Sequence, residues 1–237
     1  MRVSVVIPTR NEEAAIGRVI ADLPRDLVTE VLVVDGGSTD QTRAVAAAHG
    51  ARVIREPRRG YGRACLTGLE QIDAAADVVV FLDGDYSDRP AELPQLLAPI
   101  EAGLADLVLG SRLAGIRTPG ALPAHSVLGN RLAALLIGLV SGVSLTDLGP
   151  FRAVRPAMLR ALALQEQTYG WPVEMLVKGA ARGYRIVEVP VSYHPRIGTS
   201  KITGTVRGSL GAAWCIFSGI VKYRLKELGE RTAGRTP

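Results

Sequence analysis

The stretch from Val78 to Asp88 reads VVVFLDGDYSD, an apolar run that ends in closely spaced carboxylates. Such a run predicts a buried parallel strand whose carboxyl end opens into a ligand site. Side chains alternate along a strand, so Asp83 and Asp85 are expected to point to the same side and to repel unless a cation lies between them. Mg2+ or Mn2+ suits these oxygens, since such ions often take one or two protein carboxylates and fill their other positions with water and substrate phosphates. The motif therefore indicates a divalent metal and a diphosphate-bearing substrate, with an ordinary Asp-rich turn around Gly84 as the alternative.

A second polar cluster, VVDGGSTDQT, begins at Asp35. In one interpretation Asp35 ends a strand, and Ser38, Thr39 and Asp40 cap the next helix. In the other, the Asp35 carboxylate accepts hydrogen bonds from a base N–H or a ribose hydroxyl, as in nucleotide-binding folds. The first apolar run continues as IPTRNEEAAIG, which is neither G-x-G-x-x-G nor G-x-x-x-x-G-K-S/T. That difference argues against dinucleotide oxidoreductases and P-loop proteins.

The composition fits a large, mostly aliphatic core, because 47% of the 237 residues are hydrophobic and only 5% are aromatic. The length suits one large domain or a domain with an appendage. The formal net charge of +5 is modest, and the basic residues after Val206 lack interleaved aromatic side chains, so no nucleic-acid partner is expected. Cys65 and Cys215 lack metal-type spacing, which favours reduced thiols over a disulfide.

No segment is expected to cross a membrane. The N-terminus, MRVSVVIPTRNEE, lacks the charged leader and long apolar segment of a signal peptide. The most apolar segment, Leu132 to Val140, is interrupted by Gly138 and is well short of the roughly 20 residues of a spanning helix. We therefore expect a cytoplasmic protein, either free or peripheral on the cytoplasmic face of the membrane.

Strand and helix patterns alternate through the first half of the chain. Strands are predicted at Val3 to Ile7, Glu30 to Asp35, Ala51 to Arg55, Asp77 to Asp83 and Asp106 to Gly110, and helices at about Glu12 to Leu23, Asp40 to His49, Arg63 to Ala75 and Arg89 to Ala102. This alternation predicts an α/β fold with a mainly parallel central sheet flanked by helices. The ligand crevice then lies at the carboxyl ends of the strands, where the polar clusters fall.

The second half departs from this alternation. The expected order is a loop at Ala114 to Pro123, an amphipathic helix near Ser126 to Ser141, a strand at Phe151 to Arg155, a helix at Pro172 to Arg182, a strand at Arg185 to Val191, a basic loop at Arg196 to Gly204 and a last helix near Thr205 to Leu228. No internal repeat or low-complexity linker interrupts the chain. We therefore expect one domain over residues 1–204, followed by an amphipathic helical extension and basic tail over residues 205–237.

These motifs together resemble those of the family 2 glycosyltransferases, which have the GT-A fold. VVIPTRNEE, VVDGGSTDQT, RRGYGRACLTGLE, FLDGDYSD and GSRL occur in that family's order, and the resemblance covers about Arg2 to Arg196. Within the family, the chain looks most like the polyprenyl-phosphate (dolichyl-phosphate) hexosyltransferases. These enzymes move mannose or glucose from a nucleotide diphosphate to a lipid phosphate.

The resemblance implies a nucleotide-sugar site built from the first four strands. It makes Asp83 and Asp85 the metal and diphosphate site, with Arg58 and Gly60 closing over the nucleotide. A solvated Arg58–Arg59 pair is the alternative for that loop. The contacts that the resemblance implies to the base and ribose come from Pro8, Thr9, Glu12 and Asp35.

Arg112, Asp147 and Glu174 lie where the resemblance places the sugar and the acceptor. Asp147 would act as general base toward a hydroxyl acceptor. A phosphate acceptor is already mostly ionised near neutral pH, so Asp147 would then orient sugar hydroxyls or cap a loop. Glu174 follows Trp171 at the spacing of the family's acceptor-side motif, but an acidic residue in a first helical turn is also ordinary macrodipole chemistry.

Cations of the second half complete the implied acceptor side. Arg196, Ser200 and Lys201 could neutralise the donor diphosphate or the acceptor phosphate, or form a solvated loop. Asn130 and Arg131 match the membrane-facing helix of the lipid-phosphate enzymes, whereas the leucines beside them would equally suit a core. The C-terminal segment departs from relatives with spanning helices, and its single helix would lie at a bilayer interface, pack on the catalytic domain or form a homo-oligomer.

The resemblance implies a metal-dependent, inverting hexosyltransferase that uses Mg2+ or Mn2+ and either GDP-mannose or UDP-glucose. A polyprenyl phosphate is the expected acceptor, with a soluble hydroxyl acceptor as the alternative. Two other classes stay open: a non-catalytic sugar-nucleotide-binding or membrane-binding module, and a sugar-1-phosphate nucleotidyltransferase, which lacks support because its Gly-rich N-terminal loop is missing.

Overall fold

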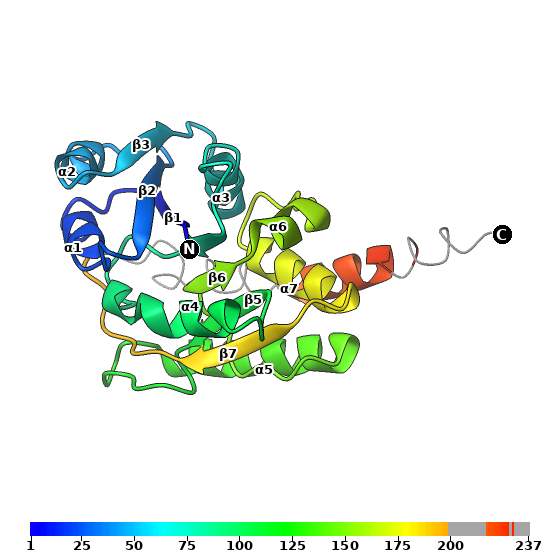
Figure 1. Cartoon of the computed structure of the whole chain (residues 1–237). Helices are drawn as coiled ribbons and strands as arrows, with labels where there is room; N and C mark the ends of the chain where they lie inside the picture. Colours follow the sequence, from blue (N-terminus) through cyan, green and yellow to red (C-terminus); the bar gives the residue numbers. More distant parts are fainter. Residues whose placement is uncertain (199–216, 228, 230–237) are drawn as a thin grey trace.

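The computed structural model describes residues 1–198, 217–227 and 229, and in these a seven-stranded sheet carries helices on both faces (Figure 1). The strands are β1 (Val3–Thr9), β2 (Val28–Asp35), β3 (Arg52–Arg55), β4 (Val78–Phe81), β5 (Leu107–Ser111), β6 (Arg152–Val154) and β7 (Ile186–Pro190). The helices are α1 (Ile16–Ala21), α2 (Thr42–Ala48), α3 (Tyr61–Leu69), a 3-10 turn at Pro90–Glu92, α4 (Leu93–Glu101), α5 (Ala124–Ser141), α6 (Pro156–Leu162) and α7 (Trp171–Ala181). Residues 217–227 form a further helix, called here the C-terminal helix.

The sheet is mainly parallel, as the alternating pattern predicts. Its order is β3-β2-β1-β4-β6-β5-β7, and β6 alone among these strands runs antiparallel to both of its neighbours. The five expected strands of the first half are confirmed, each end lying within two residues of its predicted position. The placement of β6 between β4 and β5 was not predicted, because it depends on pairing between segments far apart in sequence.

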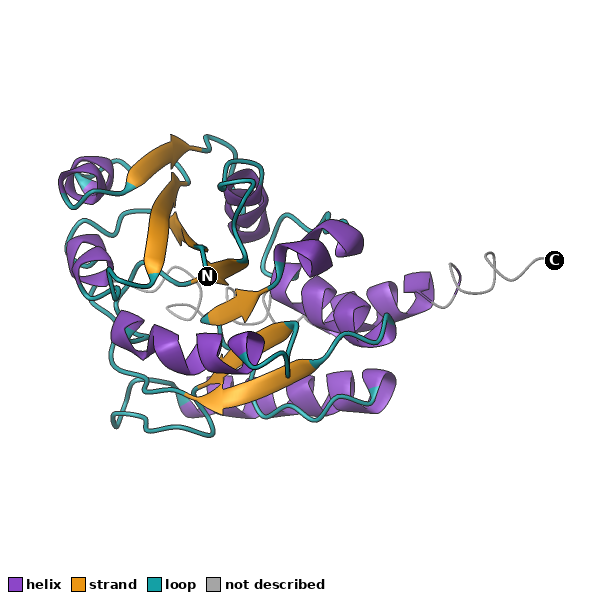
Figure 2. Ribbon diagram, viewed as in Figure 1, coloured by secondary structure: helices purple, strands orange, loops and turns teal. Residues whose placement is uncertain are grey.

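Two apolar layers hold the helices to the sheet (Figure 2). Side chains alternate along β1 and β4, so Val6 and Val79 face one layer while Val5 and Val80 face the other. The first layer contains residues of α3, α5, α6, α7 and the C-terminal helix, and the second contains residues of α1, α2 and α4. Since both faces are covered, the open ends of the strands are the natural place for a ligand.

Helix α5 differs from the amphipathic helix expected near Ser126 to Ser141. Ala133 and Ile137 are buried against the sheet, but Leu132, Leu135 and Leu139 are exposed on the opposite side. These leucines are therefore not core residues. At 18 residues, α5 is the one helix in the described part of the chain that is long and apolar enough to span a bilayer by length and composition. The sequence-based estimate of a much shorter apolar segment was wrong.

Candidate active site

The turn after β4 places its carboxylates at the carboxyl edge of the sheet. Gly84 packs so closely against the end of β1 that an added Cβ would lie 2.7 Å from Thr9 Cγ2, which explains the glycine between the two aspartates. Asp85 is only 3% exposed. Its Oδ1 accepts hydrogen bonds from Ser87 N at 2.9 Å and Ser87 Oγ at 2.5 Å, and its Oδ2 pairs with the Arg196 guanidinium.

The chain after β7 runs along this turn. Asp88 and Tyr193 form an antiparallel bridge, His194 N donates to Ser87 O at 2.9 Å, and Ile197 N donates to Asp85 O at 2.9 Å. These backbone contacts bring Arg196 to Asp85, although 111 residues separate them in sequence. Arg196 is thus placed beside the acidic turn, whereas Ser200 and Lys201 lie outside the described residues.

The acidic turn is short of positive charge. Burial, reinforced by Asp85, raises the pKa of Asp83 to about 7. Asp88 is 3% exposed, and neither of its carboxylate oxygens has a hydrogen-bond partner in the part of the chain that the structure describes. Burial raises the pKa of Asp88 well above its usual value, and the charge of Arg112 only partly offsets this effect. Three carboxyl groups lie in one turn, and among the described residues only Asp85 is paired with a cation, so the turn favours a cationic ligand.

A divalent ion fits this chemistry with Asp83 and Asp85 as its protein ligands. Among residues 1–198, 217–227 and 229, no group of three or more His, Cys, Asp or Glu side chains is arranged to hold a metal. Mg2+ and Mn2+ accept such a sparse set, because water and substrate phosphate oxygens complete their coordination. The metal prediction therefore requires the substrate to supply ligands.

Arg112 and Asp147 form a buried pair beside the same edge. Arg112 Nε lies 2.7 Å from Asp147 Oδ2, and Arg112 Nη2 lies 2.8 Å from Oδ1. The backbone N–H groups of Arg112 and Leu148 also donate to this carboxylate, at 3.0 and 2.8 Å. Burial alone would raise the pKa of Asp147, but Arg112 holds it below its usual value. Such a carboxylate is a weak base, so the geometry favours an orienting role over general-base catalysis.

The ends of β1 and β2 bring together the residues predicted to contact the nucleotide. Pro8 and Thr9 end β1, and Glu12 N donates to Thr42 Oγ1 at 2.8 Å. Asp35 is buried at the end of β2, where its carboxylate accepts from Ser38 N and from Arg43 Nη1 at 3.0 Å. Asp35 therefore ends the strand and holds the turn, as the first interpretation expects, but the N-cap of α2 is Gln41, which makes no side-chain cap hydrogen bond. The contact of Asp35 with a nucleotide stays a prediction.

The loop before α3 is held by Glu56, a residue that the sequence-based site omitted. Glu56 is buried, and its carboxylate accepts from Arg58 N, Nε and Nη2 and from Thr67 Oγ1, at 2.7 to 2.9 Å. Arg58 therefore has a fixed partner, but its side chain is 65% exposed and Arg59 is exposed as well, so the alternative of a solvated pair stays open. Gly60 has φ +145°, a backbone conformation that favours glycine. Glu56 could have been found by the signal used for the other clusters, because it directly follows β3.

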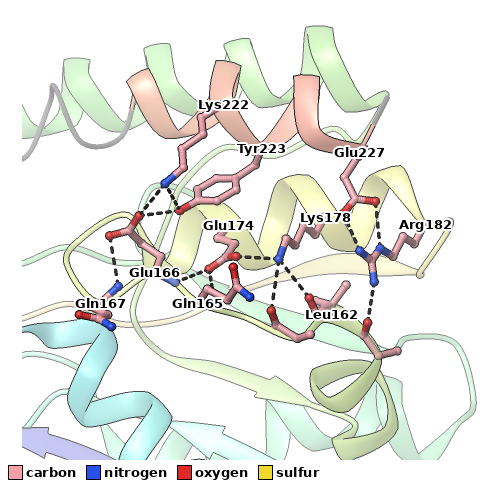
Figure 3. A network of polar contacts seen from close by, with 12 residues as sticks. Leu162, Gln165, Glu166, Gln167, Glu174, Lys178, Arg182, Lys222, Tyr223 and Glu227 are labelled. Atoms are coloured by element: carbon pink, nitrogen blue, oxygen red, sulfur yellow. Dashed lines mark hydrogen bonds and ion pairs between the residues drawn. The ribbon is translucent and has the colours of Figure 1, made fainter. Parts of the chain in front are cut away.

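Glu174 belongs to a polar network with Gln165 and Lys178 (Figure 3). It is 1% exposed in the first turn of α7, where its Oε1 is 2.7 Å from Lys178 Nζ. Its Oε2 accepts the backbone N–H groups of Gln165 and Glu166, at 2.9 and 2.7 Å. These partners are all structural, so the geometry supports a role in holding the preceding loop rather than contact with reacting atoms.

Asn130 and Arg131 lie on α5, with Arg131 on its exposed side. No contact joins Arg131 to the acidic turn in the described part of the chain, and the structure shows it on the surface that carries Leu132 and Leu135. Its predicted contact with an acceptor phosphate therefore depends on a ligand that reaches this surface.

Comparison with protein-family models gives a match over residues 4–162 to the model described as Glycosyl transferase family 2. The chain belongs to this family. An uncharacterized glycosyltransferase of Mycobacterium tuberculosis is 39% identical over 211 residues, covering 88% of this chain and 93% of the relative. A dolichyl-phosphate hexose transferase of Haloferax volcanii is 37% identical over 229 residues and 94% of each chain. An undecaprenyl-phosphate mannosyltransferase of Micrococcus luteus is 35% identical over 226 residues, covering 88% of this chain and 90% of the relative.

Solved structures place the glycosyltransferase among GT-A folds. Glucosyl-3-phosphoglycerate synthase of Mycobacterium tuberculosis, in complex with Mn2+, UDP-glucose and phosphoglyceric acid, matches with a TM-score of 0.74 and 26% identity. The match covers 94% of this chain and 79% of that one. The predicted family, fold and enzyme class, a hexosyltransferase, are therefore confirmed.

Two further residues of the glycosyltransferase site were missed by the sequence analysis. Arg152 on β6 is fully buried and donates to Gly149 O at 2.5 Å. The Tyr193 ring lies 5.1 Å from the Arg112 guanidinium carbon. The motif TDLGPFRAVR contains Arg152, but only the pairing of β6 with β4 and β5 shows that the residue is interior.

Proposed function

We propose that this glycosyltransferase moves a hexose from GDP-mannose or UDP-glucose to a polyprenyl phosphate, with inversion at the anomeric carbon. The observation that carries the donor half is the acidic turn of Asp83, Asp85 and Asp88, in which the pKa values of Asp83 and Asp88 are raised because nearby arginines only partly offset burial and the neighbouring carboxylates. Full-length similarity to a dolichyl-phosphate hexose transferase and an undecaprenyl-phosphate mannosyltransferase supports the lipid acceptor.

The chain's own residues provide binding and orientation for a single displacement. An acceptor phosphate oxygen attacks the anomeric carbon while the bond to the nucleoside diphosphate breaks. Asp83 and Asp85 would hold a Mg2+ or Mn2+ ion, which when bound acts as a Lewis acid on the leaving diphosphate. Arg196, beside Asp85, supplies a cation for the phosphates at this edge.

The hydrogen bonds that the Asp147 carboxylate accepts agree with a phosphate acceptor. This carboxylate accepts two hydrogen bonds from Arg112 side-chain nitrogens and two from backbone N–H groups. A phosphate monoester, with a second pKa near 6, is already largely ionised at neutral pH and needs no general base. A hydroxyl acceptor would need a general base. Among the described residues, Asp147 could serve as that base only if its ion pair with Arg112 opens.

The test is incubation with sugar-labelled GDP-mannose or UDP-glucose, Mn2+ and undecaprenyl phosphate, followed by organic extraction. Label should enter the organic phase only with wild-type protein, lipid and metal together, and Asp85→Asn should abolish it. Label found only in water-soluble product would reject the lipid acceptor.

A soluble acceptor is the second candidate, and one observation favours it. The solved glucosyl-3-phosphoglycerate synthase, which carries phosphoglyceric acid, matches 94% of this chain. Turnover of UDP-glucose with phosphoglycerate but without lipid would support this alternative.

We also propose peripheral binding at the cytoplasmic face of the membrane. The exposed Leu132, Leu135 and Leu139 of α5 and the exposed Val221 and Leu225 of the C-terminal helix offer apolar side chains, with Arg131 and Lys222 as nearby cations. Vesicles with anionic lipid should retain the wild-type protein and release a Leu135→Glu/Leu139→Glu variant. Equal retention of both proteins would reject this surface.

A further inference from the structure

Residues 163–170, between α6 and α7, connect two parts of the molecule that are distant in sequence. This connecting segment contacts the C-terminal helix on one side and the start of α3 on the other. Figure 3 shows Glu166 pointing toward Lys222 and Tyr223, with Gln167 on the other side of the segment. Nothing in the proposed reaction uses these residues directly.

Glu166 joins the connecting segment to the C-terminal helix. Its Oε2 accepts a hydrogen bond from the Tyr223 hydroxyl at 2.5 Å and lies 3.7 Å from Lys222 Nζ. The Tyr223 ring is buried in the same apolar layer as Ile220 and Val173. The hydroxyl is therefore presented from a packed side chain rather than from a mobile surface residue.

The other oxygen of Glu166 shapes the connecting segment itself. Glu166 Oε1 accepts from Gln167 N and Thr168 N, both at 3.2 Å, and from Thr168 Oγ1 at 2.8 Å. Beneath this turn, Glu174 accepts the N–H groups of Gln165 and Glu166. One carboxylate thus links the conformation of the segment to the position of the C-terminal helix.

The connecting segment in turn holds the first turn of α3. Arg63 N donates to Gln167 O at 3.0 Å, and Gly62 N donates to Thr168 O at 3.2 Å. The backbones touch, since a Cβ added at Gly60 would lie 2.2 Å from Gln167 O and one at Gly62 would lie 2.3 Å from Glu166 O. Any shift of the segment must therefore move Gly60 and Gly62 or break these contacts.

Residues 58–62 are called here the donor loop. We infer that Glu166 and Tyr223 are positioning residues for this loop: through their hydrogen bond, the C-terminal helix sets the conformation of the donor loop. This inference rests on the proposed function, in which Arg58 and Gly60 close over the nucleotide. Docking of the C-terminal helix on α7 then favours the closed donor loop, and loosening of the helix weakens donor binding without changing the reacting groups.

The test compares Tyr223→Phe and Glu166→Gln with a matched control, Glu227→Gln. Glu227 also anchors the C-terminal helix, but it does so by pairing at 2.7 and 2.9 Å with Arg182, which directly follows α7. Tyr223→Phe and Glu166→Gln should raise the donor Kd and KM about fivefold or more, with kcat within about twofold of wild type. Amide exchange at Gly62 and Arg63 should accelerate in both variants. Glu227→Gln should show neither effect.

Amide exchange needs no substrate, so it tests the coupling between the C-terminal helix and residues 58–62 separately from the proposed donor binding. Unchanged exchange at Gly62 and Arg63 in both variants would overturn the inference even if donor affinity falls. An equal loss of donor affinity and protection in Glu227→Gln would also overturn it, because general loosening of the helix would then explain the effect. Accelerated exchange in a protein that binds no nucleotide sugar would support the coupling and reject only the donor assignment.

Discussion

The acidic residues in the two halves of the sheet differ in how far nearby cations neutralise them. Asp83 and Asp88, after β4, have raised pKa values, and the buried Asp88 carboxylate has no hydrogen-bond partner among the described residues. Asp147 and Glu174, in the second half, are buried as Asp88 is, but they are paired with Arg112 and Lys178. Uncompensated carboxylates favour a ligand that brings positive charge, whereas compensated ones stabilise the fold around it. The comparison separates carboxylates that are expected to bind a ligand from carboxylates that stabilise the fold.

The largest expected effect is loss of activity on neutralising the turn after β4. Asp85→Asn should lower kcat/KM by at least about a thousandfold, because the variant cannot hold the cation that stabilises the leaving diphosphate. Excess EDTA should do the same to the wild-type protein, and added Mn2+ should restore it. Rates within tenfold of wild type in either experiment would contradict a metal-dependent reaction.

The next effect concerns stability in the second half. Lys178→Met leaves the Glu174 carboxylate buried without its cation, so the free energy of unfolding should fall by about 3–5 kcal/mol. Urea denaturation measures this loss. The double variant Lys178→Met/Glu174→Gln should recover most of it, since the amide oxygen can still accept from Gln165 and Glu166. If the double variant is as unstable as the single one, the charge is not the cause.

A smaller effect of opposite sign is expected at Asp88. Since burial raises the pKa of Asp88 above 3.8 in the folded protein, the folded state binds a proton more tightly than the unfolded chain. This group therefore costs stability progressively as the pH rises above that value. Asp88→Asn should raise Tm in EDTA by about 3 °C at pH 8 and by less as the pH approaches 4. A Tm difference independent of pH would contradict this explanation.

The smallest effect tests the ion pair between Arg196 and Asp85. A metal that binds Asp85 Oδ2 must displace the guanidinium, so Arg196→Gln should bind Mn2+ without nucleotide up to about fivefold more tightly. Electron paramagnetic resonance of free Mn2+ measures this affinity. Arg89→Gln is the matched control, because Arg89 donates to Tyr86 O beside the same turn. Equal changes in both variants would indicate a general charge effect.

Local patterns predicted the first half of the fold well. The alternation of apolar strands and helices placed β1 to β5, and polar residues at strand ends marked the acidic turn. The strand β6 was predicted, but its antiparallel direction and its place between β4 and β5 were not. The helix α6 was missed, although Pro156 at its start is a recognisable signal. Pairing of β6 with two distant strands has no local signature.

The surroundings of the candidate residues were harder to predict than their positions. Glu174 and Lys178 are four residues apart on one helix, so their pairing could have been read from the sequence. The pairing of Arg112 with Asp147 spans 35 residues and depends on the completed sheet. Likewise, the apolar spacing of α5 marks a stripe of leucines but not which side of the helix the rest of the protein covers.

The position of β6 also has a consequence for biosynthesis. β4 and β5 follow one another along the chain but do not pair, because β6 lies between them. A nascent chain that ends before Arg152 leaves one edge of β4 and both edges of β5 unpaired, because β6 and β7 come later in the chain, and unpaired edges promote association between chains. The N-terminal half of the sheet cannot close its hydrogen-bond ladder until the ribosome has released residues 152–154.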